Sequence, residues 1–329
     1  MRALVTGGGG FLGKAIIRQL LAGGATVRSF SRHDYPQLTT LGVEHSCGDL
    51  SDLPAVEAAV AGCDMVFHVA ARAGVWGPFA EFYQANVIGT ENVIQACRQQ
   101  GVKRLVYTSS PSVVFDGNDM AGVDESVPYP EHFHAFYPQT KAQAEQLVLA
   151  ANDQTLATVA LRPHLIWGPE DNHLVPRILE RGAKGALRRI GKRSCLVDTI
   201  YIDNAAEAHL LAAEQLDIGS VVAGKVYFLS NGEPLPLWDV INRILAAGKL
   251  PPVTRSISPG LAYAIGTLLE KVYTLLSLPG EPRMTRFVAR ELSTAHWFDL
   301  GNARRDFGYS PKISIDEGMR RLQDWLEKS

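Results

Sequence analysis

The chain has 329 residues, enough for one large domain or two moderate ones with well-packed cores. Its 32 Lys and Arg residues nearly balance its 34 Asp and Glu residues, with no basic stripe, so nucleic acid is not an expected partner. The four cysteines show no metal-ligand spacing, so we predict no metal site and a reducing, cytoplasmic environment. We expect neither a signal peptide before the first strand nor a membrane-spanning segment.

The first predicted unit is a strand, a glycine turn and a helix. Residues 3–5 form a short apolar run, typical of a buried parallel strand. Glycines follow at intervals of three, and apolar residues then recur at helical spacing as far as Leu20. A turn without side chains can approach a pyrophosphate, which the N-terminus of the helix attracts. The stretch predicts a dinucleotide site made by Gly7, Gly10, Phe11, Leu12 and Gly13.

The end of the second predicted strand, residues 25–30, indicates which nicotinamide cofactor binds. In NAD-binding domains an acid about 20 residues beyond the glycines bonds the adenosine ribose, whereas an arginine suits a 2′-phosphate. This chain has Ser31 and Arg32 there, and the nearest acid, Asp34, lies beyond the strand. We therefore predict a preference for NADP(H) over NAD(H). The alternative interpretation of Arg32 is a solvated turn residue.

Strands and helices then alternate as far as residue 163. We expect strands at residues 43–47, 65–69, 104–108 and 157–161, and helices at 53–61, 82–98 and 138–151. This alternation predicts a Rossmann-type, doubly wound parallel sheet of the α/β class.

Beyond this region prolines cluster and loops lengthen, which predicts a second, smaller lobe. We assign residues 1–170 to an NADP(H)-binding domain and residues 171–329 to a substrate-binding lobe. A buried strand expected at 196–202 predicts that the two are interleaved, with a segment near residues 195–215 returning to the first domain.

Tyr137 and Lys141 form the predicted catalytic pair. Their spacing puts both side chains on one face of a helix that Pro138 is suited to open. A free tyrosine has a pKa of about 10, too high for ready proton exchange at neutral pH. A neighbouring ammonium and the positive end of the helix favour the phenolate, so we expect them to lower the pKa of Tyr137. The alternative interpretation is an ordinary surface pair.

Together these motifs resemble those of the extended short-chain dehydrogenases/reductases over essentially the whole chain. The resemblance rests on TGGGGFLG at residues 6–13, GDL at 48–50, HVAA at 68–71, NVIGT at 86–90, YTSS at 107–110 and YPQTK at 137–141. It implies hydride transfer between a nicotinamide and a substrate carbon, while Tyr137 moves the proton on oxygen and Lys141 lowers its pKa. Ser110 would hydrogen-bond the reacting oxygen, with Ser109 as its rival.

The same resemblance implies further cofactor contacts. Asp49 and Leu50 would flank the adenine. Ala70 and Ala71 would line the cofactor channel, and Pro163 would lie beside the nicotinamide.

Residues 162–169 distinguish branches of the family. They contain no Asn, which sugar-nucleotide epimerases and dehydratases usually carry there. With YTSSPSVVF at residues 107–115, the segment is more similar to the 3β-hydroxysteroid and sterol dehydrogenase branch. Within that branch the chain resembles the bacterial 2-alkyl-3-oxoalkanoate reductases of long-chain olefin biosynthesis, at residues 73–77, 174–182, 230–236 and 295–299.

This resemblance implies an NADP(H)-dependent reductase of the 3-oxo group of an apolar, long-chain substrate. The alternatives are a 3β-hydroxysteroid or sterol dehydrogenase, a nucleotide-sugar epimerase or dehydratase, and a scaffold that binds NADP(H) without turnover. His68 and His164 are interpreted as packing or cofactor-contact residues, because the Tyr–Lys pair already supplies the acid. A homodimer and an assembly with other enzymes of the same pathway stay open.

Residues 258–278 carry an apolar stripe at helical spacing. We expect a core helix of the second lobe, with a wall for alkyl chains or a contact with a membrane or partner as alternatives. Arg72, Arg283, Arg286 and Arg290 are candidates for a carboxylate clamp, although solvated arginines are commoner.

Overall fold

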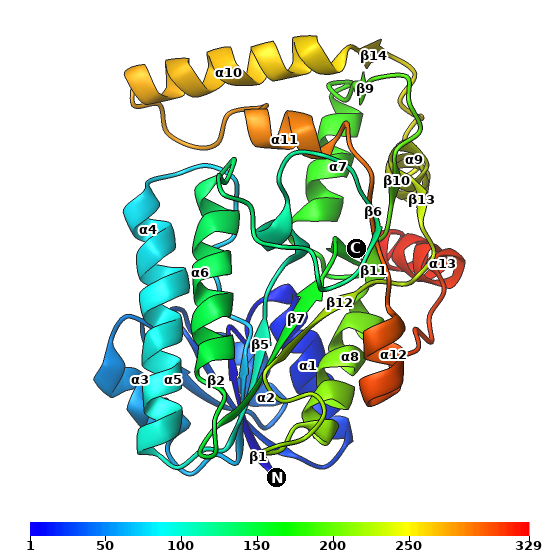
Figure 1. The fold of residues 1–329 in the computed structure, drawn as a ribbon. Coiled ribbons are helices and arrows are strands. Elements are labelled where there is room, and N and C mark those ends of the chain that lie inside the picture. The colour runs from blue at the N-terminus through cyan, green and yellow to red at the C-terminus, as the bar shows by residue number, and fades with distance from the viewer. Residues whose placement is uncertain (329) are drawn as a thin grey trace.

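The computed structural model describes residues 1–328, which are built around one large sheet (Figure 1). The sheet has seven parallel strands in the order β12-β7-β5-β4-β1-β2-β3. They are β1 (Arg2–Thr6), β2 (Thr26–Ser31), β3 (Glu44–Cys47), β4 (Met65–His68), β5 (Arg104–Thr108), β7 (Ala157–Pro163) and β12 (Lys225–Leu229). The strand order reverses between β1 and β4, the place where open α/β sheets bind their ligands.

Helices cover both faces of this sheet because its strands are apolar on both sides. In β1, Ala3 and Val5 belong to one core cluster and Leu4, between them, belongs to the other. One face is covered by α1 (Phe11–Ala22) and α8 (Ile202–Gln215), the other by α3 (Leu53–Val60), α5 (Gly89–Gln99) and α6 (Phe136–Ala150) (Figure 1). The predicted doubly wound α/β class is therefore confirmed.

In the later part of the chain one strand was missed and one strand prediction was wrong. The sheet takes its seventh strand from β12, where no strand was predicted, and β12 pairs with β7. The single strand predicted at 196–202 is instead two short strands, β10 (Leu196–Val197) and β11 (Ile200–Tyr201), neither of which joins the central sheet in the described chain. The division of the chain at residue 170 stays a prediction.

The helix predicted at residues 82–98 contains a π-helical turn. It consists of α4 (Phe79–Tyr83), the π turn η1 (Gln84–Ile88) and α5 in succession. Asn86 in this turn accepts a hydrogen bond from the backbone N–H of Arg72 at 2.7 Å and donates one to Thr140 Oγ1 at 3.0 Å. The turn thereby ties the loop after β4 to helix α6, in keeping with the frequent place of π turns beside functional sites.

The second lobe lies above the carboxyl ends of the strands, with α10 across its top (Figure 1). A small sheet joins segments distant in sequence, in the order β13 (Leu235–Pro236), β10, β15 (His296–Phe298) and β6 (Met120–Val123). The remaining elements are α2 (Pro36–Thr40), η2 (Pro111–Val114), β8 (Ile166–Trp167), α7 (Leu174–Ala183), β9 (Arg189–Ile190), α9 (Leu237–Ala247), β14 (Ser256–Ile257), α10 (Pro259–Leu275), α11 (Arg286–Glu291), α12 (Gly301–Phe307) and α13 (Ile315–Leu326).

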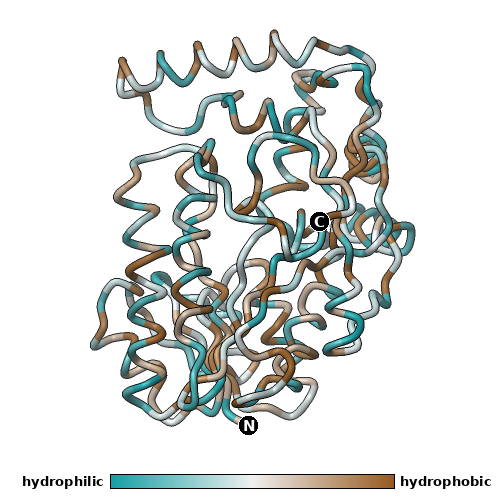
Figure 2. The backbone as a smooth tube through the Cα atoms, in the orientation of Figure 1, coloured by the Kyte–Doolittle hydropathy of each residue, from teal (hydrophilic) through white to brown (hydrophobic). Residues whose placement is uncertain are grey.

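Helix α10 is not the core helix that we expected. Of its residues, Ala262 and Gly266 are buried, whereas Leu268 is 63% and Leu275 83% exposed. Figure 2 shows its apolar residues along the outer edge of the molecule. Among residues 1–328, no helix is long and apolar enough to cross a membrane.

Candidate active site

The glycine turn after β1 packs tightly against the loop that follows β4. Gly7 has φ +70°, and a Cβ at this position would lie 2.9 Å from the backbone of Ala70. A Cβ on Gly13 would overlap the carbonyl oxygen of Gly7. Thr6 Oγ1 accepts hydrogen bonds from the backbone N–H groups of Val69 and Ala70, at 3.1 and 3.2 Å. These close approaches leave backbone, not side chains, at the bottom of the cleft.

The start of helix α1 fits a bound pyrophosphate. In the described structure, Gly10 provides no side-chain cap, and the first turn contains no acidic residue. The first N–H groups of a helix have no partner within it, and together with the helix dipole they attract an anion. A dinucleotide's phosphates suit these donors.

Three predicted residues lie at the far end of this cleft. The Ser31 hydroxyl is buried and has no hydrogen-bond partner among the described residues, while Arg32 is exposed at the rim. Asp49 accepts hydrogen bonds from the N–H and hydroxyl of Ser51 at 2.9 and 2.8 Å, and these bonds, with the charge of Arg32, hold its pKa below the usual range. An unpartnered hydroxyl beside an exposed guanidinium fits a ribose that carries a phosphate.

All predicted cofactor residues line one cavity of about 580 Å³. They are Gly7, Gly10, Phe11, Leu12, Gly13, Ser31, Arg32, Asp49, Leu50, Ala70, Ala71, Tyr137, Lys141 and Pro163.

Helix α6 carries the Tyr–Lys pair to the nicotinamide end expected for this cavity. The helix begins at Phe136, with Ala135 as its cap, so Pro138 is its third residue and not its first. Ser110, at the cap of η2, hydrogen-bonds the Tyr137 hydroxyl, and its own Oγ lies 2.9 Å from Ser112 Oγ. Ser109 Oγ is buried without a hydrogen-bond partner in the part of the chain described.

The electrostatics of this pair differ from our expectation. The pKa of Tyr137 is raised to about 12. Burial is the main cause, and the charge of Glu291 adds to it, while the Ser110 hydrogen bond acts in the opposite direction. Burial also lowers the pKa of Lys141 to about 7, opposed by the charge of Glu145. The Lys141 ammonium donates to the carbonyl oxygen of Thr108 at 2.7 Å. The predicted lowering of the Tyr137 pKa is therefore wrong in this structure, because desolvation outweighs the favourable contacts.

A buried ion pair, Arg162 with Glu145, lies close in sequence to Lys141 and Pro163. Arg162, 2% exposed, donates two hydrogen bonds to the fully buried Glu145 at 3.0 and 2.6 Å. Tyr129 donates a third hydrogen bond to Glu145 at 2.6 Å. Since Glu145 lies one turn after Lys141 and Arg162 precedes Pro163, this network fixes both walls of the cleft.

A second cavity, of about 360 Å³, adjoins the cofactor cleft. Six residues line both cavities: Ala73, Ser110, Tyr137, Pro163, Leu165 and His173. Phe115, Met120, Phe287 and Phe298 make much of its wall apolar. Tyr137 thus stands at the junction of the dinucleotide cleft and a largely apolar pocket.

The sequence analysis missed Glu291, which also lines the second cavity. Burial raises its pKa to about 8, so its carboxyl group is largely neutral at pH 7. No local pattern marks this residue, because α11 reaches the pocket only through tertiary packing.

The two histidines have different positions. His68 is buried between Thr6 and Thr90, with ring nitrogens 2.8 and 3.0 Å from their hydroxyls, and therefore packs inside the domain. His164 lines the second cavity, and its Nδ1 has no hydrogen-bond partner among residues 1–328. Burial lowers the pKa of both rings to about 3, so both are neutral at pH 7.

The four candidate clamp arginines do not gather in this pocket. Arg72 forms an ion pair with Glu81, and Arg286 pairs with Glu270. Arg290 lies over the ring of Tyr263, and Arg283 is exposed. In the described chain none of them lines the cavity beside Tyr137.

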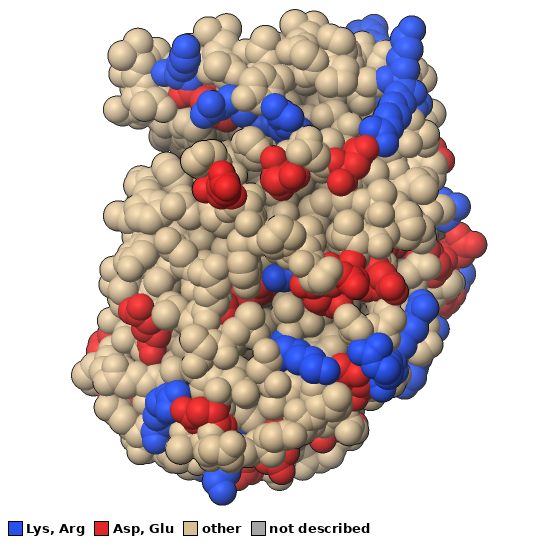
Figure 3. Space-filling model, in the orientation of Figure 1, with Lys and Arg blue, Asp and Glu red and all other residues tan. Residues whose placement is uncertain are grey.

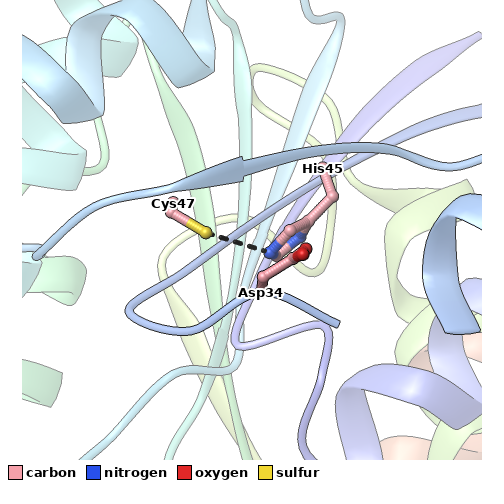
Figure 4. Close-up of side chains that lie close together, drawn as sticks. All are labelled: Asp34, His45 and Cys47. Carbon is pink, nitrogen blue, oxygen red and sulfur yellow. Dashed lines mark hydrogen bonds between the residues drawn. The ribbon is translucent and has the colours of Figure 1, made fainter. Parts of the chain in front are cut away.

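One surface group holds candidate metal ligands. Asp34, His45 and Cys47 bring their ligand atoms within 4.8 Å of one another (Figure 4). Asp34 and Cys47 are exposed, and His45 Nε2 also lies 2.9 Å from the carbonyl oxygen of His33. The prediction of no metal rested on cysteine spacing alone and stays a prediction.

The family of the chain follows from comparison with known proteins. Residues 4–251 match the 3-beta hydroxysteroid dehydrogenase/isomerase family, and the chain belongs to this family. It has the extended short-chain dehydrogenase/reductase fold and is an NAD(P)-dependent oxidoreductase that acts on a hydroxyl or ketone group.

Particular relatives are similar over nearly the whole chain. A 2-alkyl-3-oxoalkanoate reductase of Stenotrophomonas maltophilia is 56% identical, with 98% of both chains covered. One of Shewanella oneidensis is 51% identical, covering 98% of this chain and 85% of its own. A mouse sterol-4-alpha-carboxylate 3-dehydrogenase is 35% identical, covering 97% and 89%.

Among solved structures, the Thermus thermophilus UDP-glucose 4-epimerase complex with NAD has a TM-score of 0.76 at 25% identity, with both chains fully covered.

Proposed function

We propose that the protein is an NADP(H)-dependent reductase that converts a 2-alkyl-3-oxoalkanoate into the 2-alkyl-3-hydroxyalkanoate. The observation that carries this proposal is the position of Tyr137 between the dinucleotide cleft and an apolar pocket. The two reductases at 56% and 51% identity support the substrate class.

The site residues would divide the work as follows. Bound NADPH supplies the hydride. Tyr137, protonated at neutral pH because of its raised pKa, donates the proton to the developing alkoxide. Ser110, which hydrogen-bonds Tyr137 and lines both cavities, donates a hydrogen bond to the same oxygen. Ser109 lines only the cofactor cavity, which favours Ser110 for this role.

Lys141 and Arg32 would hold the cofactor at its two ends. The Lys141 ammonium lies in the cofactor cavity one turn from Tyr137, where it would hold the nicotinamide ribose. Arg32 would pair with a 2′-phosphate at the other end, and Ser31 would hydrogen-bond the same group.

A second candidate is a 3β-hydroxysteroid or sterol dehydrogenase, which the 35% identity to the mouse enzyme favours. It would use the same residues in the oxidative direction. The two functions differ in what the apolar pocket accepts.

The test measures NADPH oxidation with 2-alkyl-3-oxoalkanoates and NAD(P)+ reduction with 3β-hydroxysteroids under matched conditions. We expect turnover with the oxoalkanoates and a preference for NADPH over NADH. Turnover with steroids alone would overturn the proposed substrate. Binding of NADPH without turnover of either class would favour a scaffold.

A further inference from the structure

A third cavity, of about 1030 Å³, lies beneath helix α10. We call it the α10 groove. One wall is α10, which contributes Thr267, Lys271 and Thr274 at helical spacing, and Leu278 follows the end of the helix. The opposite wall comes from the loop at residues 75–78 and from residues 133–139. Figure 3 shows the surface notched below this helix.

The α10 groove is continuous with the pocket beside Tyr137. Val75, Trp76 and Phe287 line both cavities. The Trp76 ring meets Tyr273 of α10 edge to face, with centroids 6.3 Å apart. Trp76 is thus the residue at the passage from one space to the other.

The charged side chains of the groove are either paired with one another or exposed to solvent, so none of them needs a polar ligand as a partner. Glu270 accepts hydrogen bonds from both the backbone N–H and the guanidinium of Arg286, each at 2.6 Å. Lys271 is exposed to solvent. The remaining lining includes threonines and the apolar side chains of Trp76, Phe133 and Phe136, which suit a hydrocarbon chain.

The pocket beside Tyr137 is small for a substrate with two long chains. Its volume of about 360 Å³ is near the lower end of the roughly 300–1,000 Å³ typical of small-molecule sites. Part of that space borders the cofactor cleft through six shared residues. A long alkyl chain attached to the reacting centre needs a further space.

We propose that the α10 groove is the subsite for one alkyl arm of the substrate, which passes Trp76 while the oxo carbon stays beside Tyr137. This inference rests on the proposed function and adds the residues that set chain length. Each methylene buried in the groove strengthens binding about fourfold.

The test fills the groove from its α10 wall. Thr267→Trp places a large side chain in the groove, and Leu268→Trp is the matched control, because Leu268 does not line the groove and is 63% exposed. Thr274→Trp, on the same face as Thr267, is prepared in parallel in case the first variant does not fold. The substrates are 2-alkyl-3-hydroxyalkanoates with NADP+, in two series that lengthen one arm at a time.

In the wild type and in Leu268→Trp, we expect kcat/KM to rise with the length of each arm. In Thr267→Trp, one series alone should lose at least tenfold in kcat/KM for its long members, with the short members unchanged. An equal loss at all lengths, or no loss in either series, would overturn the subsite. If a membrane or a protein is the natural occupant of the groove, neither series should lose activity in Thr267→Trp.

Failure of the proposed function gives a different result. If no member is turned over by the wild type, the proposed function fails, and calorimetric binding of the same compounds then tests the groove by itself. Affinity that rises with arm length in the wild type but not in Thr267→Trp supports the subsite. Equal dependence on length in both proteins contradicts it.

Discussion

The cofactor cleft and the α10 groove are built in different ways. In the cleft, backbone lies against backbone: the turn at Gly7 contacts the loop at Ala70, and the Arg162–Glu145 pair is buried beneath it. In the groove, the walls are side chains, and α10 buries only two of its residues. The difference teaches that a site for a cofactor of constant shape is best built from tightly packed backbone. A site for hydrocarbon chains of different lengths can instead be built from side chains, which substitution can change without altering the fold.

The largest effect is expected at the ion pair beneath the cleft. Arg162→Met leaves Glu145 charged and buried without its partner, and breaking such a pair costs about 3–5 kcal/mol in the free energy of unfolding. The matched control is Arg98→Met, whose pair with Asp153 is exposed and is worth at most about 1 kcal/mol. Urea unfolding measures both. Equal losses in the free energy of unfolding would contradict a larger contribution from the buried pair.

The glycine turn gives the next largest effect. Gly13→Ala introduces a Cβ that overlaps the carbonyl oxygen of Gly7, and overpacking of this kind costs about 1–3 kcal/mol. We expect the displaced turn to bind NADPH about 5- to 100-fold more weakly, since 1.4 kcal/mol corresponds to a factor of ten. Gly23→Ala is the control, because a Cβ there meets only ordinary contacts. Calorimetry that finds unchanged NADPH affinity in Gly13→Ala would contradict the backbone cradle.

A smaller effect is expected at the rim. Arg32→Ala should weaken NADPH binding about tenfold, because a charge-assisted hydrogen bond contributes about 1.5–3 kcal/mol and the exposed position of Arg32 favours the lower end of this range. NADH lacks the 2′-phosphate, so its affinity should stay the same. The ratio of the two dissociation constants is the measurement. A parallel loss for both cofactors would mean that Arg32 does not recognise the phosphate.

The last prediction concerns the pH dependence of stability in the substrate pocket. The pKa of Glu291 is raised from its ordinary 4.5 to about 8, so the folded state holds a proton that the unfolded state has lost between these values. Its contribution to stability is present below pH 4.5 and is lost as pH rises to 8. Glu291→Gln removes this loss, so its melting temperature should gain on that of the wild type by several degrees as pH rises from 4.5 to 8. A difference independent of pH would contradict the raised pKa.

The sequence predicted residues that the fold brings together around one cavity, because the patterns that mark them are local. The glycine spacing spans seven residues and the Tyr137–Lys141 spacing spans five, and each motif stands at the start of a helix. Parallel strands end at the same edge of the sheet, so short motifs far apart in sequence converge there.

Burial, in contrast, was not predictable from pattern. The apolar stripe of α10 has the spacing of a core helix, yet no residue pattern states whether a second layer covers it. The pKa of Tyr137 was predicted in the wrong direction for the same reason, because desolvation depends on walls supplied by distant segments such as the one carrying Glu291. Trp76 and Phe287, far apart in sequence, line one cavity only in the folded chain.

The measurement that tests the central claim most directly is the turnover and NADPH affinity of Tyr137→Phe, with Tyr263→Phe, on α10, as the matched control. If Tyr137 moves the proton between the cleft and the pocket, turnover with a 2-alkyl-3-oxoalkanoate should fall by about 10²–10⁴, while the dissociation constant for NADPH stays the same. Near-normal turnover in Tyr137→Phe would contradict the account.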